Sequence, residues 1–294
     1  MAALPKVVIC GVGLIGGSFA LALKAAGQVG SVVGVDRDAE ALQEALRLGV
    51  IDLAAPSMDE ALVGADLVLL AVPVAQMDGV LAALAPGLGA TTVVSDAGST
   101  KQDVIAAARR CLGAKAIQFI PGHPIAGAEK SGVAAASADL YRGKRVVLTP
   151  LAENRAADVA ALSALWRHCG ATVDHLPPLV HDQTFAAVSH LPHLLAYALV
   201  HELAGRADSQ RLFAFAAGGF KDFTRIASSH PEMWRDICVA NRAPLLDEVD
   251  AFLARLLRIR VMLAAADAPA LEKMFAEARA ARDTWLEAME PPGE

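Results

Sequence analysis

The chain has 294 residues, of which 55% are hydrophobic and 20% charged, and its formal net charge is −6 at pH 7. This composition supports a sizeable folded core and excludes a largely disordered protein. A chain of this length accommodates one large domain or two domains of ordinary size. The acidic balance argues against a nucleic-acid binder, because such proteins present a basic surface to the phosphates.

The cysteines lie far apart in the sequence and form no CxxC motif; they are Cys10, Cys111, Cys169 and Cys238. We therefore expect reduced thiols and no metal site. The first residues lead directly into an apolar strand pattern without a basic segment or cleavage site, so the sequence predicts no signal peptide. The unbroken apolar runs are far shorter than the ~20 residues that span a bilayer. We expect a cytoplasmic protein.

The first half of the chain alternates short β-branched runs with helical stretches. Strands are predicted over residues 6–10, 31–35, 66–72, 91–95, 116–120, 145–149 and 172–176. Helices are predicted between them, over residues 14–26, 39–48, 75–84, 101–112 and 155–169. This alternation indicates an α/β fold of Rossmann type, in which a doubly wound parallel sheet is covered by helices on both faces.

The pattern changes at Pro177 and Pro178, because neither a strand ladder nor the interior of a helix accommodates this pair. Beyond it the chain has a helical pattern throughout. One long candidate helix covers residues 181–204, one or two more lie within residues 231–263, and a last one covers residues 269–289. Pro192 interrupts the first of them and should kink it near Val188, whose carbonyl loses its donor. We expect a Rossmann domain over residues 1–177, followed by an all-helical domain over residues 178–294 for substrate binding and dimerisation.

A glycine-rich segment (GVGLIG) lies where the first predicted strand meets the first helix. In this motif the first glycine permits a tight turn, the second lets a pyrophosphate approach the backbone, and the third lets the helix pack on the strand. The helix N-terminus then presents free N–H groups to the phosphates. We therefore expect a dinucleotide site formed by Gly11, Gly13, Leu14, Ile15 and Gly16.

Asp36 ends the second predicted strand, about 20 residues after the last glycine, where a carboxylate hydrogen-bonds the ribose hydroxyls of NAD and repels a 2′-phosphate. Arg37, its neighbour, could accommodate such a phosphate and is counted among the cofactor residues. Val72 and Pro73 end the third predicted strand, where backbone in such folds contacts the cofactor, although an ordinary strand end has the same pattern. The sequence predicts NAD as the cofactor.

Two further segments stand at the carboxyl ends of predicted strands: SDAGSTK (95–101) and GHPIAGAEKSG (122–132). Ligands of open α/β sheets bind at this edge. His123 is therefore placed for catalysis, with Ser99 one strand away as a residue that orients it. Asp96 and Thr100 are more simply interpreted as turn and cap residues.

These segments, with GVGLIGGS before them and VSHLPH, GGFKDFTRIA and PEMWRDICVAN after them, follow one another in order from residue 11 to 241. Together they resemble the prephenate/arogenate (cyclohexadienyl) dehydrogenase family. The resemblance implies an NAD-dependent oxidative decarboxylation of prephenate, arogenate or both, in tyrosine biosynthesis. In that reaction hydride passes to the nicotinamide from the ring carbon that bears the hydroxyl, and the ring carboxylate leaves as carbon dioxide.

The resemblance also implies roles for single residues. His123 would contact the ring hydroxyl, and Ser99 would hydrogen-bond near it. Arg225 would bind a substrate carboxylate, while His193 and Glu129 would lie in the substrate pocket. The apolar, glycine- and phenylalanine-rich surroundings of Arg225 also favour a carboxylate-binding residue over a surface charge.

Alternative functions fit parts of the pattern. His190 and His193 lie one helical turn apart and could bind a metal, but no carboxylate or cysteine set completes the site. β-Hydroxyacid dehydrogenases and imine reductases also join a Rossmann domain to a helical one. They place a catalytic lysine on the long interdomain helix, however, and residues 181–204 contain none. A non-catalytic NAD-sensing module would need no histidine and arginine at the crevice.

The helical domain is rich in alanine and leucine around nearly the whole circumference of its helices. One small domain does not easily bury so much apolar surface, which predicts a homodimer through this domain. Its phenylalanines, Phe213, Phe215, Phe220 and Phe223, are expected to form its core. The only other partner expected is the small-molecule substrate, with neither nucleic acid nor a membrane.

Overall fold

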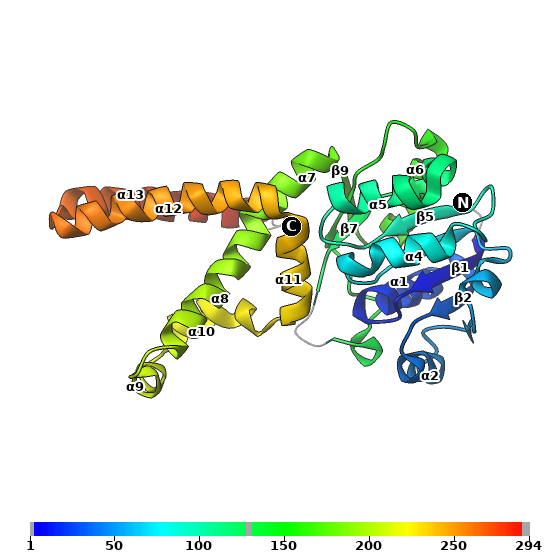
Figure 1. The fold of residues 1–294 in the computed structure, drawn as a ribbon, viewed down its shortest axis with the longest axis horizontal. Helices are drawn as coiled ribbons and strands as arrows, with labels where there is room; N and C mark the ends of the chain where they lie inside the picture. The colour runs from blue at the N-terminus through cyan, green and yellow to red at the C-terminus, as the bar shows by residue number, and fades with distance from the viewer. Residues whose placement is uncertain (1–2, 128–130, 290–294) are drawn as a thin grey trace. The chain divides into compact units, whose positions relative to one another are not determined.

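The computed structural model describes residues 3–127 and 131–289 (Figure 1). The chain divides into two compact units, Met1–Leu245 and Leu246–Glu294. The first unit contains both β-sheets and the helices that pack on them. No helix in the described ranges combines the length and the apolarity that crossing a membrane requires.

The main sheet has six parallel strands in the order β3-β2-β1-β4-β5-β6. They are β1 (Leu4–Cys10), β2 (Val29–Val35), β3 (Leu53–Ala54), β4 (Leu67–Leu70), β5 (Val93–Asp96) and β6 (Phe119–Ile120). The register pairs Cys10 with Val35 and Leu70, and Leu70 with Asp96, so the carboxyl ends of four strands share one edge. Doubly wound sheets bind ligands at this edge. The predicted Rossmann-type sheet is confirmed.

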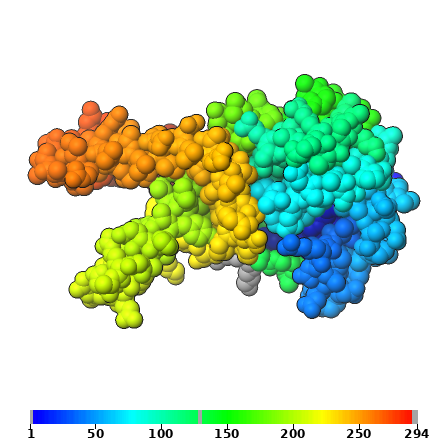
Figure 2. All heavy atoms as spheres, viewed as in Figure 1, coloured from blue at the N-terminus to red at the C-terminus, as the bar shows by residue number. Residues whose placement is uncertain are grey.

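Helices cover both faces of this sheet. They are α1 (Leu14–Ala25), α2 (Ala39–Arg47), α3 (Met58–Leu62), α4 (Met77–Leu84) and α5 (Gln102–Leu112), with 3₁₀ turns η1 (Val74–Gln76) and η2 (Gly113–Gln118). Val7 and Ile9 of β1 belong to one hydrophobic core, and Val8 and Cys10 to the other, because successive side chains of a strand point to opposite faces. The space-filling view shows α4, in cyan, and α5, in blue-green, covering the nearer face (Figure 2).

The strands after residue 121 do not continue the parallel sheet, contrary to the prediction. β7 (Gly122–Ile125), β8 (Arg145–Leu148) and β9 (Thr172–His175) form a separate sheet, in which β7 runs antiparallel to β8 and β8 parallel to β9. Strand β7 was not predicted, because Pro124 lacks a backbone N–H. As an edge strand of its sheet, β7 tolerates this proline. Helix α6 (Ala156–His168) packs against β9.

The helical part of the first unit follows at Pro178. Its elements are α7 (Pro178–Phe185), the π-helical turn η4 (Ala186–His190), α8 (Leu191–Ala204), α9 (Ser209–Ala214), α10 (Gly218–Thr224), the 3₁₀ turn η5 (Arg225–Ser228) and α11 (Pro231–Ala240). The irregularity predicted near Val188 is the turn η4. Pro192 cannot donate to the carbonyl one turn before it, and a widened turn accommodates the break. Helix α7 contacts α5, and α11 contacts η1, so these helices pack on the sheet domain.

The second unit consists of most of α12 (Arg242–Ala264) and of α13 (Ala268–Met289). No residue of α13 is buried, and Leu245 is the one buried residue of α12. Large apolar side chains on these helices are exposed: Leu246, Leu253, Leu256, Leu257, Val261, Leu263, Phe275, Trp285, Leu286 and Met289. Packing of the two helices against each other therefore leaves a large apolar surface exposed, as on a surface that binds another protein.

The phenylalanines of α9, of the residue that follows it and of α10 do not form a core, contrary to the prediction. Phe215 is 84% exposed and Phe223 55% exposed. Phe213 and Phe220 form an edge-to-face pair with ring centroids 6.0 Å apart, although Phe213 is itself exposed. A sequence pattern does not distinguish an apolar side chain that is buried within its own domain from one that lies exposed on the surface of the chain.

Candidate active site

The loop between β1 and α1 has the geometry of a dinucleotide cradle. Gly11 has a φ of 92°, and a Cβ there would lie 2.5 Å from the carbonyl oxygen of Ala71. A Cβ at Gly16 would lie 2.3 Å from the carbonyl oxygen of Gly11, so only glycine lets α1 approach this closely. A Cβ at Gly13 would meet no atom within 4 Å, so the space beside this residue is open to a ligand.

The N-terminus of α1 supplies hydrogen-bond donors to this space. Gly13 is the N-cap residue, and no side chain caps the helix. The first-turn N–H groups, which include those of Leu14 and Ile15, have no partner within their own helix, and the positive end of the helix dipole lies among them. These residues therefore fit the pyrophosphate of a dinucleotide.

Asp36 follows β2 at the same edge and is hydrogen-bonded to the glycine loop. Its Oδ2 accepts a hydrogen bond from the N–H of Val12 at 2.8 Å, and its Oδ1 accepts one from the N–H of Asp38 at 3.0 Å. The carboxylate is thus held beside the loop, where a ribose would follow the pyrophosphate. Arg37, the next residue, is exposed.

The segment after β4 approaches the same loop. A Cβ built on Gly11 would lie 3.0 Å from a methyl carbon of Val72, which is half-buried. Pro73 is exposed and precedes η1. The structure thus brings Gly11, Asp36 and Val72 together at one edge of the sheet.

A buried ion pair connects the last residue of β5, Asp96, to the first residue of β7, Gly122. The ammonium of Lys101 contacts Oδ2 of Asp96 and donates a hydrogen bond to the carbonyl of Gly122 at 2.6 Å. Asp96 also accepts hydrogen bonds from the N–H groups of Gly98 at 2.8 Å and Gly122 at 3.0 Å. Both charged side chains are 0% exposed, and these hydrogen bonds satisfy them. The pair holds Gly122, and therefore the neighbouring His123, at the sheet edge.

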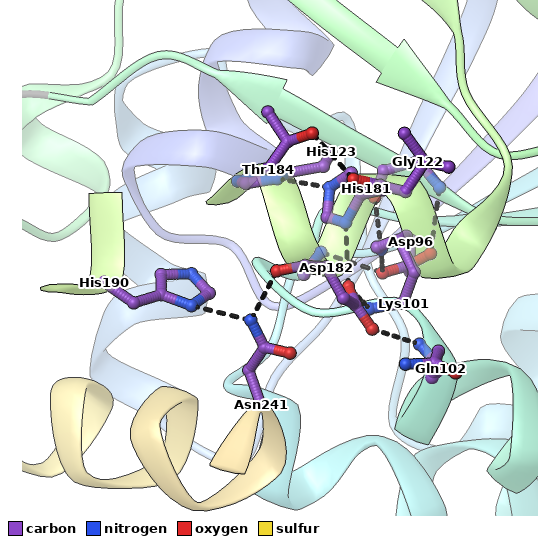
Figure 3. Close-up of polar contacts among 12 residues, drawn as sticks. Asp96, Lys101, Gln102, Gly122, His123, His181, Asp182, Thr184, His190 and Asn241 are labelled. Carbon is purple, nitrogen blue, oxygen red and sulfur yellow. Dashed lines mark hydrogen bonds and ion pairs between the residues drawn. The ribbon is translucent and has the colours of Figure 1, made fainter. Parts of the chain in front are cut away.

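His123 begins a chain of hydrogen bonds that leads into α7 (Figure 3). Its Nδ1 lies 2.9 Å from Nε2 of His181, and Nδ1 of His181 lies 2.8 Å from Oδ1 of Asp182. His123 is half-buried, whereas His181 and Asp182 are buried. Sequence analysis missed both α7 residues. Their signal was a His-Asp pair in the middle of a short helix that begins with three apolar residues.

The surroundings of His123 and His181 lower the pKa values of both imidazoles and so favour their neutral forms. Burial, together with the nearby His181 and Lys101, lowers the pKa of His123 well below its usual value. Burial also lowers the pKa of His181, although the hydrogen bond to Asp182 opposes this shift. A neutral imidazole has one nitrogen that accepts a hydrogen bond or a proton. His123 is therefore able to accept a proton across the neutral pH range.

His190 has a structural contact. The side-chain amide of Asn241 donates to Nδ1 of His190 at 3.0 Å and to the backbone carbonyl of Asp182 at 2.8 Å (Figure 3). His190 is buried, and burial lowers its pKa to about 4. Over the part of the chain that the structure describes, no group of three or more histidine, cysteine, aspartate or glutamate residues has a metal-binding arrangement.

His193 faces a different environment from His190. Its ring stacks on that of Trp234, with centroids 3.6 Å apart and an interplanar angle of 19°. Its Nδ1–H donates to the carbonyl of Ser189 at 2.8 Å, which leaves Nε2 as an acceptor. Burial lowers the pKa of His193, and the positive charge of Arg225 adds to this effect. Arg225 begins η5, which packs against α8, the helix that carries His193.

Two predicted residues are less closely tied to this arrangement. Ser99 is half-buried in the bend between β5 and α5, and its role stays a prediction. Glu129 lies outside the described residues, in the gap from 128 to 130.

Comparison with known proteins identifies the family. The model for "Prephenate dehydrogenase, nucleotide-binding domain" matches residues 19–175, and the model for "Prephenate dehydrogenase, dimerization domain" matches residues 177–277. The prephenate dehydrogenase of Bacillus subtilis is 39% identical over 282 residues, which cover 94% of this chain and 75% of that protein. The cyclohexadienyl dehydrogenase of Zymomonas mobilis is 36% identical over 284 residues, 96% of each chain.

A solved structure agrees in fold as well as in sequence. Prephenate dehydrogenase from Aquifex aeolicus, in complex with hydroxyphenyl propionate and NAD+, superposes with a TM-score of 0.90 at 35% identity. The match covers 96% of this chain and 98% of that one. The resemblance read from the sequence motifs is thereby confirmed. The chain belongs to the prephenate dehydrogenase family.

Proposed function

We propose that this protein catalyses the NAD-dependent oxidative decarboxylation of prephenate, arogenate or both, in tyrosine biosynthesis. The relatives named above are prephenate and cyclohexadienyl dehydrogenases, and the Aquifex structure contains NAD+. The observation that carries the proposal is the position of His123, a neutral histidine at the same sheet edge as the glycine cradle. The β-hydroxyacid dehydrogenase alternative is not favoured, because prephenate dehydrogenase models match both parts of the chain.

The nucleotide-binding part of the proposal assigns each cofactor residue a task. Bound NAD supplies the acceptor for the substrate hydride. Gly11, Gly13 and Gly16, with the N–H groups of Leu14 and Ile15, hold its pyrophosphate, and Asp36 accepts hydrogen bonds from its ribose. Val72 and Pro73 line the same edge, and Arg37 flanks the ribose site. The open space beside Gly13 and the anchored carboxylate of Asp36 support this assignment.

In the proposed chemistry, His123 takes the proton of the ring hydroxyl. As hydride leaves the carbon that bears it, the hydroxyl becomes carbonyl-like and strongly acidic, so even a histidine of low pKa is a sufficient base. The O–H bond breaks as the N–H bond forms, and the ring carboxylate departs as carbon dioxide while the ring becomes aromatic. The imidazolium of His123 then returns its proton to the phenolate oxygen, which gives the phenol product and the neutral histidine. We propose that Ser99 hydrogen-bonds near this hydroxyl and orients the reacting groups.

We propose that Arg225 binds a substrate carboxylate and that His193 and Glu129 line the same pocket. Three features support the first two roles. Arg225 acts electrostatically on His193, His193 retains an acceptor nitrogen, and the hydroxyl of Tyr197 donates to the carbonyl of Ser229 at 2.5 Å, which holds η5 against α8. An arginine in a fixed segment suits planar, bidentate recognition of a carboxylate.

We further propose a Rossmann domain over residues 1–177, a helical domain over residues 178–294 and a homodimer formed through the helical domain. The two family models meet between residues 175 and 177, and the second is a dimerization domain. The boundary between the two compact units lies further along the chain, after Leu245, because α7 and α11 pack on the sheet domain and therefore belong to the first unit. The exposed apolar surface of α12 and α13 supports pairing with a second copy.

A cytoplasmic location belongs to the same proposal. All four cysteines are free, which suits a reducing compartment.

Steady-state kinetics test the proposed reaction. Purified protein is incubated with prephenate or arogenate, each with NAD or NADP, and NADH or NADPH formation is followed by absorbance. We expect substrate-dependent NADH formation with at least one of the two substrates and release of carbon dioxide in equal amount. A protein that binds NAD but forms no NADH with either substrate would refute the proposal and would leave the NAD-sensing alternative.

A further inference from the structure

We propose that His181 and Asp182 are positioning residues for His123: two consecutive hydrogen bonds fix His123 in the tautomer whose Nε2 is free to take the substrate proton. The inference rests on the proposed function for the identity of the proton donor. The tautomer itself is a property of the protein alone, so it is open to measurement without substrate.

The direction of the hydrogen bonds follows from the acceptor at the end of the chain. An ionised carboxylate only accepts, so Nδ1 of His181 must carry a hydrogen and donate it to Asp182. A neutral imidazole has one N–H group, so Nε2 of His181 is bare and accepts. The group 2.9 Å from it, Nδ1 of His123, must therefore donate. Nε2 of His123 remains as the bare, basic nitrogen.

Asp182 is held in the ionised form that this direction requires. Its Oδ1 accepts the N–H of Lys101 at 2.8 Å, and its Oδ2 accepts the N–H of Gln102 at 2.9 Å, at the N-terminus of α5 (Figure 3). Burial would raise the pKa of Asp182, but the hydrogen bonds from His181 and from the backbone outweigh it and lower the pKa. With backbone donors on both oxygens, the carboxylate has no hydrogen to donate, and the reverse direction is excluded.

Packing keeps water away from the hydrogen bonds that link His123, His181 and Asp182. His181 is 0% exposed and Asp182 2% exposed. Phe185, one helical turn beyond His181, packs on both histidine rings, with centroid distances of 4.6 Å to His181 and 4.8 Å to His123. Since no solvent donor competes for Nε2 of His181, the imidazole of His123 is the donor that satisfies it.

The arrangement also suits the charge that develops in the reaction. When Nε2 of His123 takes the hydroxyl proton, the ring becomes an imidazolium whose Nδ1–H still points to His181, and the carboxylate of Asp182 lies beyond it. The other titratable groups that act on these two rings are Lys101, Asp96 and His190. Lys101 is paired with Asp96, so Asp182 is the carboxylate that His181 links directly to His123. A carboxylate plays the same orienting part behind the histidine of a Ser-His-Asp triad.

The test uses matched variants of His181. His181→Leu removes the acceptor for Nδ1 of His123, whereas His181→Gln retains an amide oxygen close to the position of Nε2. We expect kcat to fall roughly 100-fold in His181→Leu, within the range for lost general-base function, with little change in the KM for NAD. His181→Gln should recover most of that loss. Gln183→Ala, an exposed change on the same helix, is the control and should leave kcat unchanged.

A spectroscopic measurement separates this proposal from the proposed function. Nitrogen-15 NMR of the imidazole rings, assigned with His123→Asn, reports which ring nitrogen carries hydrogen in the full-length protein without substrate. We expect His123 to be protonated at Nδ1 and bare at Nε2 in the wild type, and to lose this preference in His181→Leu.

Opposite results overturn the proposal. A wild-type His123 protonated at Nε2, or a His181→Leu variant with wild-type tautomer and kcat, would exclude the positioning role. A wild type that forms no NADH with prephenate or arogenate would refute the proposed function. The tautomer measurement would still decide whether His181 and Asp182 position His123. Asp182→Asn should shift the tautomer in the same direction, with Tm recorded because this residue also caps α5.

Discussion

Lys101→Met removes one half of the buried Asp96–Lys101 ion pair while keeping the length of the side chain. Both groups are 0% exposed, so water does not replace the lost partner of Asp96. Removing one partner of a buried pair typically destabilises a protein by about 3–5 kcal/mol. Asp96 keeps the N–H donors of Gly98 and Gly122, so we expect the lower end, roughly 3 kcal/mol. For a unit of this size that corresponds to a fall in Tm of roughly 6–12 °C.

Differential scanning calorimetry measures this fall, and a double-mutant cycle assigns it to the pair. Asp96→Asn and Lys101→Met are each destabilising alone, whereas the double variant should lose less than their sum, because neither charge is then left unpaired. Lys144→Met, which removes an exposed lysine, is the control and should leave Tm unchanged.

The same variant has an independent effect on catalysis. The charge of Lys101 helps to lower the pKa of His123, so Lys101→Met should raise that pKa. Because the protonated imidazole does not accept a proton, the acidic limb of the kcat/KM profile should move to higher pH. A folded variant with wild-type Tm would refute the stabilising role of the ion pair. An acidic limb that stayed in place would refute the electrostatic link to His123.

Four further predictions concern the active site and the assembly. His123→Asn should lower kcat by ~10²–10⁴-fold, a larger loss than Ser99→Ala causes. It should also abolish the acidic limb of the pH profile, which in the wild type lies below the ordinary histidine pKa of ~6.5. A variant that retained both kcat and the acidic limb would point to another residue as the base. Arg225→Ala should raise the substrate KM strongly, by something like 2–4 kcal/mol of lost binding, while NAD affinity measured by calorimetry stays nearly constant; a normal KM would return this arginine to the surface. Asp36→Ser should narrow the preference for NAD over NADP, and a wild type that used both equally would contradict the role of the carboxylate. Light scattering at micromolar concentration should report a dimer, whereas a mass near 30.5 kDa, that of one chain, would argue against it.

Local sequence determined the nucleotide-binding loop and the type of most elements. The glycine requirements at Gly11 and Gly16 come from a positive φ and from contacts with the adjoining strands, which a short motif encodes. The alternation of β-branched runs and helical stretches likewise reports which short segments are strands and which are helices. The turn η4 near Pro192 was predictable for the same reason, since a missing N–H affects the helical turn that precedes it.

Tertiary structure alone decided which polar groups meet. His123 and His181 are 58 positions apart, and the bonds from the N-terminus of α5 to Asp182 span 80 and 81 positions. No local propensity encodes such pairs, because they depend on how α7 packs against α5. The antiparallel direction of β7 also depends on β8, which lies at least 20 positions further along the chain. The sequence therefore determined that His123 stands at a strand end, whereas the packing of α7 decided which of its ring nitrogens is left free.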